Sequence, residues 1–109
     1  ILRKSLNPGA QAIANAIFPA DQAQALRIIE KTLKKAGVSG DDVRVNNGSG
    51  LGCGGIATAR TVVKVLKWSV TRPWADAFWH ALPRPGKGTL KHRFLGGPAK
   101  IMAKTGTLD

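Results

Sequence analysis

Two amphipathic patterns at the start of the chain, residues 8–18 and 21–36, constrain its fold most, and Pro19 separates them. In both segments the apolar residues recur every three or four positions, which places them on one face of a helix. The second segment carries two lysines in its last turn and is followed by Gly37. Cations and a following glycine both favour the end of a helix at that point. The sequence therefore predicts two helices, each with one apolar face.

The remainder of the chain mixes helical patterns with short extended ones. A glycine-rich stretch, residues 46–55, has no periodicity and predicts a loop. The spacing predicts two further helices, over 58–68 and 73–81, and short strands over 43–45, 90–95 and 100–104. The predicted fold class is α+β, mostly helical with two or three short strands.

The length of 109 residues fits a single domain, or a domain fragment, over 1–109. No run approaches the roughly 20 apolar residues needed to cross a bilayer. The first residues include neither an initiator Met nor a signal-peptide core. The sequence begins as if cut from something longer, so we expect a segment of a larger protein.

The charge is strongly positive: 17 Lys and Arg face six acids, giving a formal net charge of +11. Such a balance favours attraction to a polyanion, which could be nucleic acid, anionic lipid or an acidic wall polymer. The bases are spread along the chain, no RNA-binding fingerprint occurs, and Tyr is absent. An ordinary solvated basic surface explains the same numbers, so charge alone does not choose a partner.

Metal and disulfide chemistry have little support in the sequence. The single cysteine, Cys53, excludes an internal disulfide and a cysteine-based zinc site. His80 and His92 lie far apart and lack the spacing of a ligand pair. We expect no metal and no cofactor.

The triplet Lys104-Thr105-Gly106 near the end of the chain carries the clearest candidate chemistry. Its ammonium and hydroxyl groups can both bind a substrate carboxylate, and its glycine permits close approach to the backbone. Such a triplet is one signature of serine enzymes that recognise penicillin. Alone it is better explained as the polar end of a strand before a turn.

Two other glycine-rich stretches do not meet the requirements of known motifs. Ser49 lies between two glycines, but a nucleophile elbow needs one residue more before the serine. The stretch Gly86-Lys87-Gly88 lacks the four residues that a phosphate-binding P-loop places before its Gly-Lys pair. Neither stretch is predicted to be an active site.

Taken in order, the motifs resemble one enzyme family. The segment "NNGSGLG" at 46–52, the "LP" before "GTLKHRF" at 88–94, and "KTGTLD" at 104–109 follow one another as in the D-alanyl-D-alanine carboxypeptidase/endopeptidase group of low-molecular-mass class C penicillin-binding proteins. The opening residues 1–18 resemble the family helix that carries its Ser-x-Asn motif. The resemblance implies a partial penicillin-binding/β-lactamase-like transpeptidase domain, periplasmic or extracytoplasmic.

The resemblance also implies a substrate-binding edge, made of Lys104, Thr105, Gly106 and Thr107. In one register the family's Ser-x-Asn motif falls on Gly9 and Gln11, so that both residue types are lost. In an alternative register, shifted by four residues, Ser5-Leu6-Asn7 retains both types.

No serine of the chain has a lysine three residues later, so the family's Ser-x-x-Lys nucleophile is absent from these residues. Without it no acyl-enzyme can form, and we expect no catalytic residue in this chain by itself.

Three functions follow from these observations. The first is a segment of a carboxypeptidase that contributes the Lys-Thr-Gly strand and acts on peptidoglycan peptides with a nucleophile from the remainder of the parent enzyme. The second is a non-catalytic basic binding module or toxin domain derived from that fold, with a polyanion or protein partner. The third is an unrelated helical nucleic-acid-binding protein, which would show binding that weakens steeply with salt.

Overall fold

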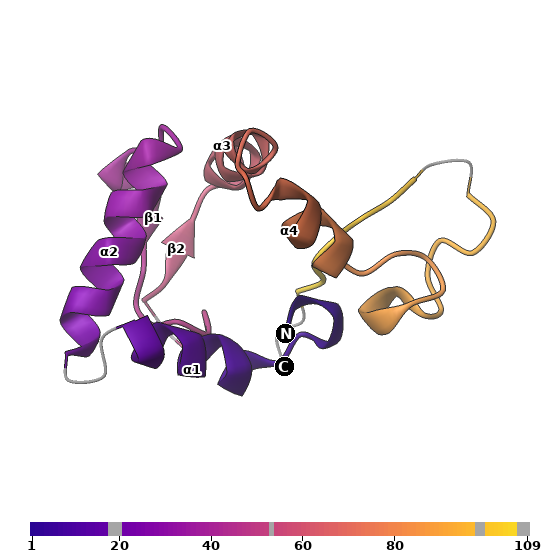
Figure 1. Ribbon diagram of the computed structural model, residues 1–109, viewed down its shortest axis with the longest axis horizontal. Helices are drawn as coiled ribbons and strands as arrows, with labels where there is room; N and C mark the ends of the chain where they lie inside the picture. The colour runs from indigo at the N-terminus through magenta and orange to yellow at the C-terminus, as the bar shows by residue number, and fades with distance from the viewer. Residues whose placement is uncertain (18–20, 53, 98–99, 107–109) are drawn as a thin grey trace. The chain divides into compact units, whose positions relative to one another are not determined.

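A computed structural model describes residues 1–17, 21–52, 54–97 and 100–106. The chain divides into two compact units (Figure 1). We call the first the terminal unit, because it joins Ile1–Leu6 to Pro73–Asp109, and the second, Asn7–Arg72, the central unit. Each unit is described by itself below.

The central unit begins with two packed helices, α1 (Asn7–Ile17) and α2 (Gln22–Lys35). Asp21 caps α2, since its Oδ1 accepts hydrogen bonds from the backbone N–H groups of Ala23 and Gln24 at 2.9 and 3.2 Å. The buried residues of the two helices are small, Ala14 in α1 and Ala25 in α2.

A short two-stranded sheet follows α2. After a 3-10 turn, η2 (Gly40–Asp42), strand β1 (Val43–Arg44) pairs antiparallel with β2 (Ile56–Ala57), in the register Val43 to Ala57 and Arg44 to Ile56. The sequence predicted the first strand over 43–45 and did not predict the second. A strand of two residues is too short to show alternation, so the partner of β1 is visible only in the structure.

Helix α3 (Ala59–Ser69) completes the central unit, and a chain of hydroxyl bonds fixes its start. Thr58 caps the helix by accepting the backbone N–H of Thr61 at 3.1 Å. The Thr61 hydroxyl, on a buried side chain, donates to the backbone oxygen of Asp42 at 3.0 Å. The same Asp42 oxygen accepts the backbone N–H of Thr58. The N-terminus of α3 is therefore held against η2.

The terminal unit contains η1 (Leu2–Lys4), α4 (Ala75–Ala81) and η3 (Gly88–Leu90). Among the described residues of this unit, the buried side chains are Leu82 and Pro83, directly after α4, and Leu90, the last residue of η3. Trp74, directly before α4, and Phe78 on α4 meet edge to face, with ring centroids 5.9 Å apart. The core of this unit therefore lies around residues 82–90.

The strand predicted over 90–95 is wrong. Leu90 ends η3, and the backbone N–H of Arg93 bonds back to the oxygen of Leu90, which makes a turn. Phe94 has a φ of 60°, in the left-handed region that no regular strand uses. The glycines around this stretch allow it to turn where its apolar residues alone suggested extension.

Residues 100–104, also predicted as a strand, have no strand partner among the described residues. Their backbone bonds instead to a loop, because Ala103 donates its N–H to the oxygen of Pro83 at 3.1 Å. Strands exist only in pairs, so the sequence pattern could not decide this. The fold class nevertheless is confirmed as α+β and mostly helical. In the described part of the chain, no helix has the length and apolarity to cross a membrane.

Candidate functional site

The Lys104-Thr105-Gly106 triplet lies at the end of the described chain, directly after the Ala103–Pro83 bond. Lys104 is exposed and its ammonium donates to the backbone oxygen of Thr105. Around Gly106, a Cβ added to the backbone would meet no atom within 4 Å. Lys104 and the Gly106 backbone are therefore accessible from solvent in this unit. Thr107, the fourth predicted residue of the substrate edge, lies outside the described residues.

The triplet is attached to the core of the terminal unit. Pro83, whose oxygen accepts the Ala103 N–H, is fully buried together with Leu90. A second backbone bond, from the N–H of Gly86 to the oxygen of Leu90 at 3.1 Å, closes the loop between them. The start of the triplet is thus anchored to a packed segment rather than to an exposed loop.

The Ser5-Leu6-Asn7 sequence follows η1, in the same unit up to Leu6. Ser5 has a left-handed backbone, with φ 53° and ψ 49°, and its N–H bonds to the oxygen of Leu2. The N–H of Leu6 bonds to the oxygen of Ile1 at 3.1 Å. Asn7 is the first residue of α1.

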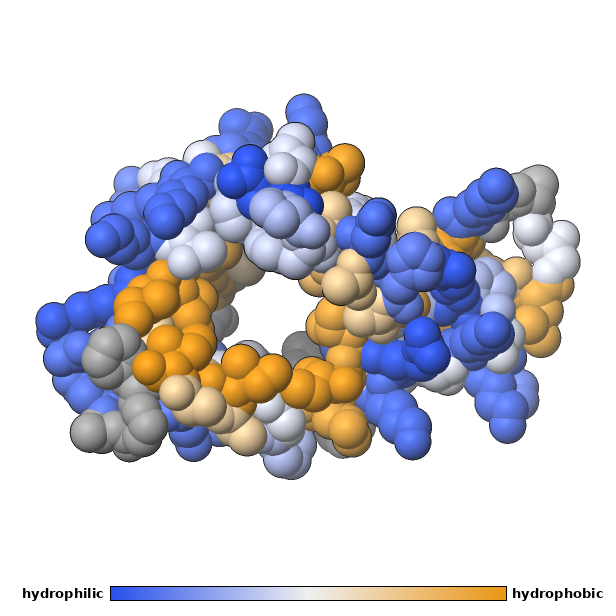
Figure 2. Space-filling view, in the orientation of Figure 1, coloured by the Kyte–Doolittle hydropathy of each residue, from blue (hydrophilic) through white to orange (hydrophobic). Residues whose placement is uncertain are grey.

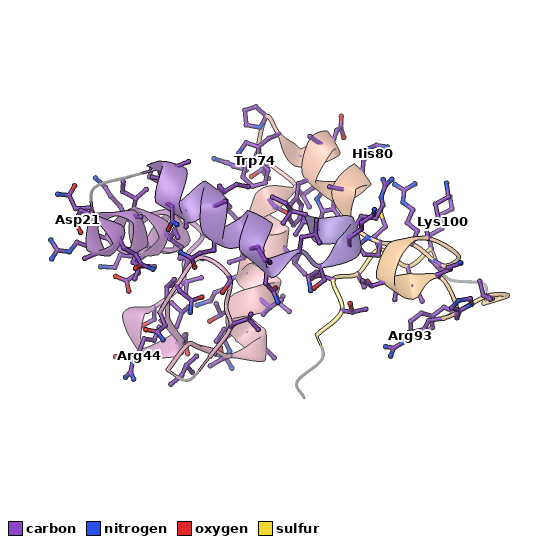
Figure 3. The ribbon with its side chains drawn as sticks, turned by 90° about the horizontal axis from the view of Figure 1, so that it is seen from below. Asp21, Arg44, Trp74, His80, Arg93 and Lys100 are labelled. Carbon is purple, nitrogen blue, oxygen red and sulfur yellow. The ribbon has the colours of Figure 1, made fainter. Side chains whose placement is uncertain are left out.

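Two contacts hold η1 to the rest of the terminal unit. Arg3 donates from Nη2 to the backbone oxygen of His80, at the end of α4, at 3.1 Å. Gly88 packs so closely on η1 that an added Cβ would lie 2.4 Å from the backbone oxygen of Arg3. Figure 3 labels His80 on α4, where its backbone oxygen accepts the bond from Arg3. The structure therefore brings the segment with Ser5 and the segment with Lys104 into one compact unit.

Gly9 and Gln11, the other register of the Ser-x-Asn motif, lie on α1 in the central unit. The Gln11 side chain already has two partners: Oε1 accepts the backbone N–H of Gly48 at 3.0 Å, and Nε2 donates to Oδ1 of Asn15 at 2.8 Å. Its amide thus joins α1 to the glycine-rich loop. The structure does not bring Gly9 and Gln11 into the unit that holds Lys104.

The glycine-rich loop is organised around the side chain of Asn47. Its Oδ1 accepts the backbone N–H groups of Ser49 and Gly50, at 3.0 and 2.7 Å, and the Ser49 hydroxyl at 2.8 Å. Its Nδ2 donates to the oxygen of Leu51. The Ser49 hydroxyl also accepts the N–H of Leu51. Ser49 thus has structural partners within its own loop.

Sequence reasoning missed Arg3, His80 and Pro83 as residues that organise the site. The Arg3–His80 bond joins residues 77 positions apart, and the acceptor in both cases is a backbone oxygen. A backbone oxygen is present in every residue, so no sequence signal could have identified these acceptors. Only the structure shows that His80 and Pro83, three residues apart, accept bonds from Arg3 and Ala103.

Comparison with known proteins gives two findings. The model of the D-Ala-D-Ala carboxypeptidase 3 (S13) family matches residues 1–109 of this chain. A D-alanyl-D-alanine carboxypeptidase from Actinomadura sp. (strain R39) is 38% identical over 89 residues, a match that covers 74% of this chain and 16% of the relative. The chain thus spans about a sixth of the length of this curated relative. These findings confirm the resemblance that the order of the motifs indicated.

Proposed function

Because this chain belongs to the D-Ala-D-Ala carboxypeptidase 3 (S13) family, we propose that it forms the substrate-binding edge of a D-alanyl-D-alanine carboxypeptidase. The substrate is a peptidoglycan peptide that ends in D-alanine. The nucleophile, a Ser-x-x-Lys serine, comes from the remainder of the polypeptide, which we call the parent enzyme. The chain alone is then one side of an active site, located outside the cytoplasm where peptidoglycan lies.

Each residue of the edge has a part in holding the substrate. The Lys104 ammonium binds the terminal carboxylate of the substrate as an ion pair, and the Thr105 hydroxyl donates a hydrogen bond to the same carboxylate. Gly106 has no side chain, so the peptide can lie directly along the backbone. Thr107 is the fourth residue of the proposed edge. Binding the carboxylate in this way positions the scissile carbonyl for attack.

We further propose that the Ser-x-Asn motif of the family falls on Ser5 and Asn7. Ser5 lies in the unit that contains Lys104, and its segment is fixed against Gly88. The Gln11 amide, in the other register, is engaged by Gly48 and Asn15. In this role the Ser5 hydroxyl transfers a proton during acyl transfer, and the Asn7 amide binds the peptide backbone.

One observation carries the proposal. Arg3, two residues before Ser5, bonds to the oxygen of His80, and Ala103, one residue before Lys104, bonds to the oxygen of Pro83. Residues 80 and 83 belong to one short segment at the end of α4. The two motif segments, about a hundred residues apart, therefore share one anchor, as the two sides of a single site require.

A fluorescent β-lactam tests the proposed function, because it acylates the nucleophilic serine of such enzymes. We expect the parent enzyme to be labelled and the 109-residue chain alone to remain unlabelled. A parent enzyme whose Ser-x-x-Lys serine is changed to Ala is the matched control and should lose the label. A folded parent enzyme that takes no label contradicts the proposal.

The same experiment separates the alternative of a basic binding module or toxin domain. If the parent protein takes no label and the chain binds heparin with an affinity that falls steeply with salt, the positive charge is the functional feature. Labelling of the parent enzyme argues for the carboxypeptidase.

A further inference from the structure

The central unit contains an apolar groove of about 290 Å³. It lies between the C-terminal end of α1, the C-terminal half of α2, and α3. Its lining includes Ile17, Ile28, Leu33, Val65 and Trp68. The one hydroxyl in the lining, that of Thr32, donates to the backbone oxygen of Ile28 at 2.8 Å and needs no further partner. The groove is therefore suited to apolar side chains and not to a polar small molecule.

Several large apolar side chains of the central unit are exposed, whereas its buried hydrophobic side chains are small. Among the described residues of this unit, the buried hydrophobic ones are Ala14, Ala25 and Val38, whereas Ile17 and Ile28, in the groove, remain 43% and 38% exposed. Figure 2 shows hydrophobic residues gathered along α1 and on the neighbouring part of α2. Covering apolar surface of this kind with a partner removes it from water, which lowers the free energy.

The charged residues beside the groove are mostly basic, with Glu30 on α2, next to the lining residue Ile29, as an acidic exception. On α2, Lys31 and Lys35 follow Ile28 by three and seven residues, which places both lysines on the same side of the helix as Ile28. On α3, Lys64 precedes Trp68 by one turn, and the guanidinium of Arg72 lies 5.0 Å from the centre of the Trp68 ring. No Asp or Glu is among the residues that line the groove. An occupant with acidic flanks would be complementary to these edges.

We propose that this groove receives an amphipathic helix of the parent enzyme, with an apolar stripe flanked by Glu or Asp. The proposal rests on the proposed function, because the helix belongs to the polypeptide outside these 109 residues. A chain that spans 16% of a curated relative leaves most of such an enzyme to supply the helix. An apolar helix face lying in a groove is a common mode of protein recognition.

Charge and shape argue against two other occupants. A second copy of this chain would bring another net charge of +11 against the same positive edges. A membrane surface is flat on this scale and would cover exposed residues rather than fill a groove between helices. The groove and its charged edges together favour an acidic helix.

Binding of designed helical peptides to the 109-residue chain tests the proposal without using enzyme activity. The acidic probe is a 16-residue amphipathic peptide with a leucine stripe flanked by Glu, and the basic probe carries Lys at the same positions. The readout is the indole N–H signal of Trp68 by NMR, with Trp74 and Trp79 of the terminal unit as internal references. We expect the acidic probe to shift the Trp68 signal and to bind at least tenfold more tightly than the basic probe.

Two valines of α3 provide a matched pair of variants. Val65→Ser alters the lining of the groove and should weaken the acidic probe at least tenfold, whereas Val63→Ser, at an exposed position outside the lining, should leave its affinity within twofold. Both changes have the same intrinsic effect on the helix. Helix content, measured by circular dichroism, must match between the two variants for the comparison to count.

Three results would overturn the proposal. One is equal binding of the acidic and basic probes. Another is a concentration-dependent dimer of the chain that Val65→Ser abolishes, which would assign the groove to a second copy. The third is binding to anionic phosphatidylglycerol vesicles, lost in Val65→Ser, with no binding of the acidic probe. Failure of β-lactam labelling would contradict the proposed function and leave these binding results unchanged.

Discussion

The side chain of Gln11 on α1 holds the backbone of Gly48, 37 residues later, through a hydrogen bond of 3.0 Å from the Gly48 N–H to Oε1. Gly48 lies so close to the helix that an added Cβ would be 2.3 Å from the Cβ of Ala14. The glycine-rich loop is therefore packed on α1 at this point. Its order comes from this contact and from the hydrogen bonds around Asn47.

Replacing Gly48→Ala should destabilise the central unit. The new methyl group overlaps Ala14, so α1 and the loop must separate, and we expect a loss of about 1–3 kcal/mol in the free energy of unfolding. Urea denaturation followed by circular dichroism measures this loss. The control is Gly40→Ala, whose Cβ meets no atom within 4 Å and which should change stability by less than about 0.5 kcal/mol. Equal effects of the two variants would refute the close packing.

Replacing Gln11→Ala should release the loop at Gly48. The part-buried N–H of Gly48 loses its acceptor, which costs about 1 kcal/mol and raises its hydrogen-exchange rate about fivefold. NMR-detected exchange of this amide is the direct measurement. Gln22→Ala, at an exposed position at the start of α2, should leave the Gly48 amide unchanged. An unchanged Gly48 amide in Gln11→Ala would show that the bond has no protective effect.

Replacing Gly88→Ala should detach η1 from η3. Gly88 has a φ of 58°, which costs a residue with a Cβ about 1 kcal/mol or more, and the methyl group would overlap the backbone oxygen of Arg3. We expect altered NMR shifts for Arg3 and Ser5 and a terminal unit less stable by about 2 kcal/mol. Gly97→Ala is the control, because its φ is not positive and its nearest atom is 3.9 Å away. Native shifts at Arg3 and Ser5 in Gly88→Ala would contradict this account.

Replacing Ser5→Ala in the parent enzyme distinguishes the two registers of the Ser-x-Asn motif. If Ser5 transfers a proton, its loss should slow acylation by a β-lactam about 100-fold or more. The control is Ser39→Ala, at an exposed serine that caps η2 in the central unit. In the other register Ser5→Ala has no effect on acylation, and Gly9→Ser increases the rate.

Replacing Lys104→Ala in the parent enzyme should weaken binding of a substrate peptide about tenfold or more, because a charge-assisted bond to its carboxylate is lost. Lys100→Ala removes an equal charge four residues earlier and should change the affinity less than about twofold. A peptide amide, which lacks the carboxylate, should bind both variants and the unaltered enzyme alike. Equal losses in the two lysine variants would indicate general attraction rather than a specific contact.

Parts of the fold could be predicted because they depend on neighbouring residues. Helices α1, α2 and α3 follow from apolar spacing, and the caps at Asp21 and Thr58 lie where the sequence placed the helix starts. The strands could not be predicted in the same way. β2 depends on β1, twelve or more residues away, and residues 90–95 turn because of backbone angles that their apolar side chains do not reveal.

The site shows the same division. The order of three motifs was enough to indicate the family, because each motif is a local set of residue types. Where Ser5, Gln11 and Lys104 lie was decided by long-range contacts, from Arg3 to His80, from Ala103 to Pro83 and from Gly48 to Gln11.

The sequence by itself therefore determined the helices, the glycine-rich loop and the family, since these depend on local spacing and residue type. Only the tertiary structure decided which segments share a unit, which serine lies in the same unit as Lys104, and which apolar face stays uncovered. These outcomes depend on backbone hydrogen bonds and close packing between residues far apart in the chain. Every residue has the same backbone groups, so the sequence cannot show which of them pair.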